Sequence, residues 1–124
     1  MNENITILYV DDETINLQIF EINFRKKYKV ITAMSGKEGL EKLEGHNDIL
    51  VVVSDMKMPG MNGIEFIKKA KETHEHVVYF ILTGFDITEE ISDAIKDNTI
   101  NQYFRKPFNM KEINMAIETA LTNA

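Results

Sequence analysis

Three carboxylates stand directly behind two apolar stretches of the sequence. Asp11 and Asp12 directly follow residues 5–10. Asp55 follows residues 49–53 after one serine. Carboxylates that lie close together repel one another unless a cation lies among them or one of them takes up a proton. A set of oxygen ligands without thiolates suits a hard ion, Mg²⁺ above all. The three acids therefore predict a Mg²⁺ site if the fold brings them together.

A hydroxyl and an amine stand at two further positions of the same kind. Thr83 closes the apolar stretch of residues 77–82, and Lys106 follows the stretch of residues 100–104. Each group has an ordinary structural alternative, because Asp and Thr are common in turns and helix caps and a lysine fits any solvated surface. The three acids, the hydroxyl and the amine all follow the C-terminal ends of apolar stretches, which favours one common site.

The elements that must position these groups alternate along the chain. Apolar stretches at five places predict strands: residues 5–10, 29–34, 49–53, 77–82 and 100–104. Helical spacing of apolar residues between them predicts five helices, the first over residues 14–27. The third stretch is apolar throughout, which is typical of a strand covered on both faces of a parallel sheet. The short, polar fifth stretch suits an edge.

Local signals predict where the helices begin and which faces point inward. Four helices start with a capping residue and a glutamate three positions later: Ser35 and Glu38, Asn62 and Glu65, Asp86 and Glu89, Asn109 and Glu112. Apolar residues of the first helix fall at helical spacing with charge on the other side: Ile15, Ile19 and Ile22, flanked by Phe20 and Phe24. The last helix is expected to bury Met110, Ile113, Ile117 and Leu121.

Strands that alternate with helices over short loops predict one α/β domain over residues 1–124, with a flavodoxin-like (βα)5 doubly wound parallel sheet. In its strand order, 2-1-3-4-5, the first and third strands are neighbours at the point where the winding reverses. Asp11, Asp12 and Asp55 would then lie in one crevice. Thr83 and Lys106 would end on the same rim.

Composition limits the functions that remain. The chain has 124 residues, of which 44% are hydrophobic and 27% charged, which suits one domain with a real core. A net charge of -6 and a pI near 5.0 argue against direct nucleic-acid binding. The absence of cysteine excludes a disulfide framework and a cysteine nucleophile. Because neither a signal peptide nor a membrane-length apolar run is present, we expect a cytoplasmic protein that does not enter a membrane.

The combination resembles the response-regulator receiver domain of two-component signalling, either of the stand-alone chemotaxis type or cut from a longer protein. The resemblance rests on motifs that span nearly the whole chain: Asp11-Asp12, Asp55 with Met-Pro-Gly-Met-Asn-Gly following, Thr83-Gly84, Tyr103 and Lys106-Pro107. It implies that Asp55 accepts a phosphoryl group from a phosphohistidine of a sensor histidine kinase or phosphotransfer protein. It also implies that Asp12 and Asp55 ligate Mg²⁺ directly, that Asp11 holds it through water, and that the backbone carbonyl of Lys57 is a further ligand.

The resemblance further implies a switch. Thr83 would move toward the phosphoryl group and Tyr103 would swing inward, which reshapes the face made by the fourth helix, fifth strand and fifth helix. A downstream protein or a missing effector domain would read that face, and we expect a monomer before phosphorylation. Tyr103 also fits an ordinary half-buried aromatic of an edge strand. The bond between Lys106 and Pro107 is expected to be cis, as in the family.

The chemistry follows from the residues themselves. Asp55 would attack the phosphorus while Mg²⁺ and Lys106 neutralise the equatorial oxygens. Phosphorylation replaces one negative charge with about two, which recruits the Thr83 hydroxyl. Lys57 and Phe85, each two positions beyond a site residue, flank the path of water to the phosphorus, so we expect slow loss of the phosphoryl group.

Other functions fit parts of the pattern. A Mg²⁺-dependent aspartyl phosphatase of the haloacid-dehalogenase type needs a second acid two residues after its nucleophile, where this chain has Lys57. A flavin or nucleotide module needs a phosphate-cradling loop, and the acids after the first strand would repel phosphate. A receiver-like domain that only binds partners is a third alternative, and the intact set of Asp55, Thr83 and Lys106 argues against it.

Overall fold

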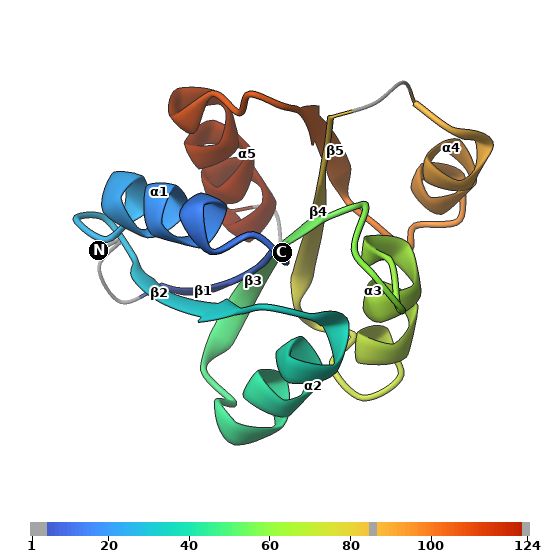
Figure 1. The fold of residues 1–124 in the computed structure, drawn as a ribbon, viewed down its shortest axis with the longest axis horizontal. Coiled ribbons are helices and arrows are strands. Elements are labelled where there is room, and N and C mark those ends of the chain that lie inside the picture. Colours follow the sequence, from blue (N-terminus) through green and yellow to red (C-terminus); the bar gives the residue numbers. More distant parts are fainter. Residues whose placement is uncertain (1–4, 85–86, 123–124) are drawn as a thin grey trace.

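The strands form one parallel sheet in the order β2-β1-β3-β4-β5 (Figure 1). The computed structural model describes residues 5–84 and 87–122. The strands are β1 Thr6–Val10, β2 Lys29–Ala33, β3 Ile49–Asp55, β4 Val78–Thr83 and β5 Gln102–Arg105. All four neighbouring pairs are parallel. The flavodoxin-like order predicted from the sequence is therefore confirmed, and β5 lies at an edge as expected.

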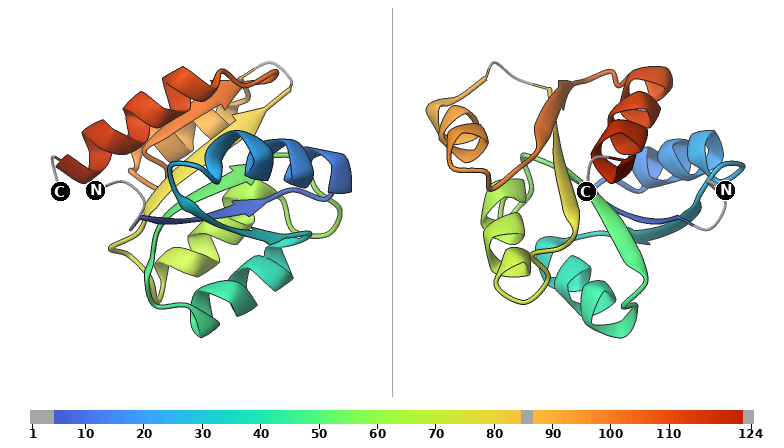
Figure 2. Two further views of the ribbon diagram at one scale, coloured as in Figure 1. Left: turned by 90° about the vertical axis from the view of Figure 1, so that its left-hand side faces the viewer. Right: turned by 180° about the vertical axis from the view of Figure 1, so that it is seen from behind.

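Within the described residues, five helices cover the two faces of this sheet. They are α1 Thr14–Phe24, α2 Gly36–Gly45, α3 Gly63–Lys71, α4 Glu89–Lys96 and α5 Met110–Thr122. Helices α1 and α5 lie on one face, and α2, α3 and α4 lie on the other (Figures 1 and 2). Because the strands are all parallel, the loops that follow them gather at one end of the sheet.

Three of the predicted helix starts are confirmed by hydrogen bonds. The side-chain oxygens of Ser35, Asn62 and Asn109 accept from backbone N–H groups three residues later, at 3.0, 2.9 and 3.1 Å. In α3 the bond is reciprocal, because Glu65 Oε1 accepts from the Asn62 N–H at 2.8 Å. The first turn of α3, which directly follows the Asp55 loop, is thereby fixed.

The start of α4 differs from the prediction. Thr88 caps this helix, and its hydroxyl oxygen accepts from the Ile91 N–H at 3.2 Å. Thr88 is itself a good capping residue, so the helix begins at Glu89 with no glutamate needed three positions after the cap. Asp86, the expected cap, lies outside the described residues.

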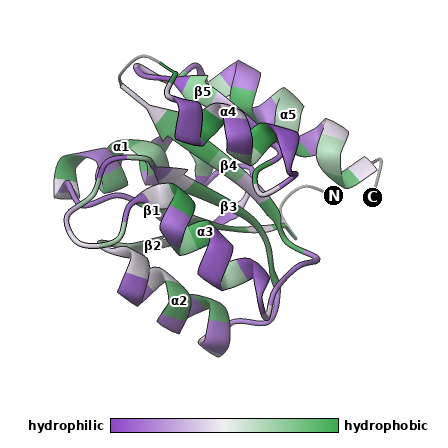
Figure 3. Cartoon of the chain, turned by 90° about the vertical axis from the view of Figure 1, so that its right-hand side faces the viewer, coloured by the Kyte–Doolittle hydropathy of each residue, from purple (hydrophilic) through white to green (hydrophobic). Residues whose placement is uncertain are grey.

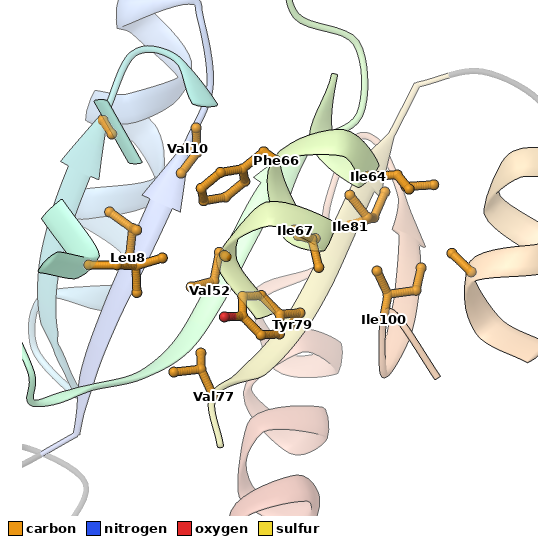
Figure 4. Packing of buried hydrophobic residues seen from close by; sticks show 14 of the residues in the cluster. Leu8, Val10, Val52, Ile64, Phe66, Ile67, Val77, Tyr79, Ile81 and Ile100 are labelled. Atoms are coloured by element: carbon orange, nitrogen blue, oxygen red, sulfur yellow. The ribbon is translucent and has the colours of Figure 1, made fainter. Parts of the chain in front are cut away.

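Each face of the sheet has its own hydrophobic core. On the side of α2, α3 and α4, Phe66 and Ile67 pack against Leu8, Val52 and Tyr79 of the strands (Figure 4). The strands are hydrophobic along their length, while the helices expose polar turns to the outside (Figure 3). This two-sided burial explains why the residues of β3 form a continuous apolar run.

Helix α1 faces the sheet with Phe20 and Phe24 of the predicted apolar set but not with the three isoleucines. Ile15, Ile19 and Ile22 are 64, 44 and 58% exposed, whereas Leu17, Phe20 and Phe24 form the buried face. The reason is aromatic packing: Phe20 stacks on Tyr9 with ring centroids 4.1 Å apart, and Phe24 stacks on Phe20 at 4.4 Å. The helix also ends at Phe24 rather than at residue 27.

The C-terminal elements contain a second correction. Ile113 and Ile117 are fully buried and Leu121 packs against the same core, as predicted, but Met110 is 36% exposed. Met110 is the first residue of α5, where the helix has only begun to cover the sheet. Strand β5 begins two residues later than expected, at Gln102.

Candidate functional site

The three carboxylates meet at one end of the sheet. Strands β1 and β3 are neighbours in register, with Val10 opposite Ser54, so the next residues of both strands share an edge. Carboxylate oxygens of Asp11, Asp12 and Asp55 lie within 4.8 Å of one another. Asp11 is fully buried and Asp55 nearly so, while Asp12 is partly exposed. The predicted acidic crevice is therefore present.

Lys106 lies among these acids. Its Nζ is 2.7 Å from Asp55 Oδ1 and 3.5 Å from Asp11 Oδ2. The backbone places it there, because the Lys106 N–H donates to the Thr83 carbonyl at 2.8 Å and so holds the end of β5 beside the end of β4. The bond between Lys106 and Pro107 is cis, as expected. The amine and the carboxylate that were predicted to act together are in direct contact.

The charges of the site perturb one another. Burial raises the pKa of the Asp55 carboxyl, and the charges of Asp11 and Asp12 raise it further, against the opposing hydrogen bond and charge of Lys106. Burial by itself would lower the pKa of the Lys106 ammonium, but its hydrogen bond and charge interaction with Asp55, together with the charge of Asp11, raise it. Lys106 therefore supplies a permanent positive charge at neutral pH.

Asp11 has partners that the sequence did not reveal. Its Oδ2 accepts from the Tyr9 hydroxyl at 2.7 Å and from Asn16 Nδ2 at 3.2 Å. Its Oδ1 accepts from the Glu13 N–H at 3.0 Å. A signal for Tyr9 was available, because side chains two apart on a strand point to the same side of the sheet. No comparable pattern identified Asn16.

A solvent-open hollow gives access to the acids. Its walls come from the ends of four strands and the loops that follow them: Asp12, Glu13, Asp55, Lys57, Met58, Pro59, Gly84 and Lys106. Lys57 is exposed at this hollow. A group entering from solvent can thus reach the Asp55 carboxylate. Phe85, which we expected to shield the site together with Lys57, lies outside the described residues.

The two predicted switch residues are placed differently from the acids. Thr83 is 2% exposed at the end of β4 and borders a smaller hollow beside Met56 and Ile91. Tyr103 is half-buried and packs against the core on the side of α3 and α4. Thr83 is the last residue of β4, and Tyr103 belongs to the neighbouring strand β5.

A divalent cation fits the donor set. Within residues 5–84 and 87–122, Asp11, Asp12 and Asp55 are the one group of three or more acidic or histidine side chains that could share an ion. All their donors are oxygens, and one of the acids is open to solvent, which suits an ion that retains several waters. These residues therefore match the requirements of Mg²⁺.

Comparison with known families decides the assignment. The model of the response regulator receiver domain matches residues 7–118. The chain belongs to this family. Receiver domains bind Mg²⁺ at an acidic pocket, and this receiver domain has an acidic cluster of Asp11, Asp12 and Asp55.

Relatives of this receiver domain include short and long proteins. Sporulation initiation phosphotransferase F of Bacillus subtilis is 33% identical over 122 residues, covering 98% of this chain and 95% of that protein. The response regulator SaeR of Staphylococcus aureus is 35% identical over 94% of this chain and 50% of its own length. The hydrogenase transcriptional regulatory protein HoxA of Cupriavidus necator is 30% identical over 83% of this chain. The chain spans only 21% of the length of HoxA.

Solved receiver structures share the fold. The response regulator receiver domain protein of Clostridium thermocellum superposes with a TM-score of 0.85 at 32% identity, covering 96% of this chain and 95% of that one. The chemotaxis protein CheY4 of Vibrio cholerae gives a TM-score of 0.83 at 26% identity, covering 93% of this chain and 97% of that one. Among the described helices of this receiver domain, none combines the length and apolar content that crossing a membrane requires.

Proposed function

We propose that this receiver domain is a phosphorylation-dependent switch in which Asp55 accepts a phosphoryl group from a phosphohistidine of a sensor histidine kinase or phosphotransfer protein. One observation carries the proposal: the Asp55 carboxylate borders an open hollow while Lys106 Nζ lies 2.7 Å from its Oδ1 and two more acids lie beside it. A nucleophile, a fixed cation and a set of metal ligands are thereby gathered around one carboxylate.

The transfer step needs little besides positioning and charge neutralisation. A carboxylate oxygen of Asp55 attacks the phosphorus, the phosphorus–nitrogen bond breaks, and the imidazole keeps the electron pair of that bond. An acyl phosphate forms on Asp55. The Lys106 ammonium, already paired with Asp55, neutralises negative charge on the phosphoryl oxygens.

Mg²⁺ would be held directly by Asp12 and Asp55 and by the backbone carbonyl of Lys57, with Asp11 acting through water. When bound, the ion supplies positive charge to the phosphoryl oxygens. The hydrogen bonds of Asp11 support its indirect role, because Tyr9, Asn16 and Glu13 already donate to both of its oxygens.

The signal would leave the site through Thr83 and Tyr103. Thr83 moves toward the phosphoryl group, Tyr103 swings inward, and the face of α4, β5 and α5 changes shape. The half-buried position of Tyr103 against the core beside α4 supports this route, since its ring has both a buried and an exposed side. A downstream protein or an effector domain reads the altered face, and the unphosphorylated form is a monomer in the cytoplasm.

The exposed isoleucines of α1 support the docking of the phosphodonor protein. Ile15, Ile19 and Ile22 leave an apolar stripe on a helix that begins at the acidic crevice. A second hollow joins Ile19 to Lys106, so the stripe is continuous with the reactive end of the sheet. Apolar residues gathered on one exposed face mark a protein contact.

The experiment is phosphorylation by a small donor such as phosphoramidate in the presence of Mg²⁺, followed by intact-mass measurement. One phosphoryl group should add to the wild type, none to Asp55→Asn and one to the matched variant Asp93→Asn, which changes an exposed acid of α4. An adduct in Asp55→Asn, or one formed in excess EDTA, contradicts the proposal. As a phosphoacceptor regulator, this receiver domain takes part in its own phosphorylation and dephosphorylation and turns over no other substrate.

A further inference from the structure

We propose that Tyr9 is a positioning residue of the site: its hydroxyl holds Asp11 in place and thereby keeps Lys106 on Asp55. This inference rests on the proposed function, and it assigns a role to a residue of β1 that takes no part in phosphoryl transfer itself. The contact is specific, since the Tyr9 hydroxyl donates to Asp11 Oδ2 at 2.7 Å.

Asp11 needs such a donor because it has no access to water. Its side chain is 0% exposed, and a buried carboxylate is stable only when its oxygens are hydrogen-bonded. The Tyr9 hydroxyl makes the shortest contact to Oδ2, ahead of Asn16 Nδ2 at 3.2 Å and Lys106 Nζ at 3.5 Å. Tyr9 is thus the principal neutral donor to this oxygen.

Tyr9 is itself rigidly held. It is 1% exposed, its ring stacks on Phe20 at 4.1 Å with planes 3° apart, and its backbone lies between Thr32 and Val53 of the neighbouring strands. The hydroxyl is therefore held at a fixed point beside Asp11.

This arrangement determines how Lys106 divides between two acids. Asp11 and Asp55 compete for one ammonium, which lies 3.5 Å from the first and 2.7 Å from the second. Because Tyr9 and Asn16 already satisfy Asp11 Oδ2, Lys106 can pair closely with Asp55. Without the phenol, Asp11 would draw Lys106 toward itself and turn away from the ion site.

The test compares two tyrosines that each lose only a hydroxyl. Tyr9→Phe keeps the ring that stacks on Phe20, and the matched control is Tyr79→Phe, a fully buried tyrosine of β4 whose hydroxyl donates to the His74 carbonyl at 2.8 Å. Both variants should lose thermal stability to a similar degree. Mg²⁺ binding is measured by calorimetric titration with the ion alone. Tyr9→Phe should bind the ion about tenfold more weakly than the wild type, as is typical when a residue that hydrogen-bonds a metal-site carboxylate is lost. Tyr79→Phe should bind it with wild-type affinity.

A second readout separates positioning from simple destabilisation. At saturating Mg²⁺, Tyr9→Phe should still be phosphorylated more slowly by phosphoramidate than Tyr79→Phe, because Lys106 is displaced. Equal Mg²⁺ affinity in the two variants overturns the inference. If Tyr9→Phe does not fold, Asn16→Ala removes the weaker donor to the same oxygen, and a tenfold or greater loss of Mg²⁺ affinity in that variant would show that Asn16, and not Tyr9, is the principal donor. The Mg²⁺ titration needs no phosphodonor. A wild type that takes up no phosphoryl group would therefore contradict the proposed function but leave the difference in Mg²⁺ affinity between the two variants unaffected.

Discussion

At the level of single residues, repulsion among the acids of the site opposes their attraction to Lys106. Asp11, Asp12 and Asp55 place three negative charges within 4.8 Å, and Lys106 compensates for only part of them. The residual repulsion destabilises the protein without a cation and favours binding of one. Asp12 is the acid with most access to solvent, so it can be neutralised with the least disturbance of the hydrogen bonds.

Asp12→Asn should accordingly stabilise the protein in EDTA by about 1 kcal/mol, the size of a like-charge interaction near 4 Å in a water-like medium. The same variant should lose most of the stabilisation that Mg²⁺ gives the wild type, because one direct ligand is gone. Urea unfolding with and without Mg²⁺ measures both effects, and Asp93→Asn on exposed α4 is the control. A less stable Asp12→Asn in EDTA would show that repulsion among the acids is weaker than the favourable contacts of the Asp12 carboxylate.

At the level of elements, the proposed partner contact lies on the exposed face of α1, apart from the reactive groups. Its buried face, Leu17, Phe20 and Phe24, supports Tyr9, while its exposed isoleucines face solvent. Ile19→Glu should therefore slow phosphoryl transfer from a histidine-phosphorylated protein at least tenfold, as loss of a central apolar contact does at many interfaces. Phosphorylation by phosphoramidate should stay at the wild-type rate. Equal slowing with both donors would mean that the substitution damages the site and not the docking surface.

The elements also show what sequence could and could not predict. Three helix caps and the edge position of β5 followed from local signals, whereas strand order followed from the alternation of strands and helices, which matches the flavodoxin-like order. The prediction for α1 was wrong for its three isoleucines, because this helix carries apolar residues on both sides. Periodicity cannot choose between Ile19 and Phe20, and aromatic stacking on Tyr9 made the choice.

The same limit applies to the site. Asp11, Asp12, Asp55 and Lys106 were predicted because strand ends converge in this topology, and the structure brings them together. The hydrogen bond of Tyr9 depends on where a side chain points within the core, which residue types alone do not specify. The roles of Thr83, Tyr103 and the Lys57 carbonyl stay predictions, because they concern a phosphorylated or metal-bound state.

For the molecule as a whole, the proposed switch requires that phosphorylation of Asp55 change a distant surface. Beryllofluoride, a mimic of the phosphoryl group, should shift amide NMR signals of α4, β5 and α5 more than those of α2. The reason is that the proposed route from the crevice runs through Thr83 and Tyr103 to the first face, whereas α2 packs against β1 and β2 at the other side of the sheet (Figure 1). Equal or larger shifts in α2 would contradict the switch.

Every step of this switch depends on Asp55 as the residue that carries the phosphoryl group. Chemical trapping identifies that residue: the receiver domain is phosphorylated with phosphoramidate and Mg²⁺, the acyl phosphate is reduced with borohydride, and the peptides are sequenced by mass spectrometry. We expect the aspartate at position 55 to be converted to homoserine, with no conversion at Asp11 or Asp12. Conversion at either of those acids, or none at position 55 in protein that has gained a phosphoryl mass, would show that Asp55 is not the acceptor.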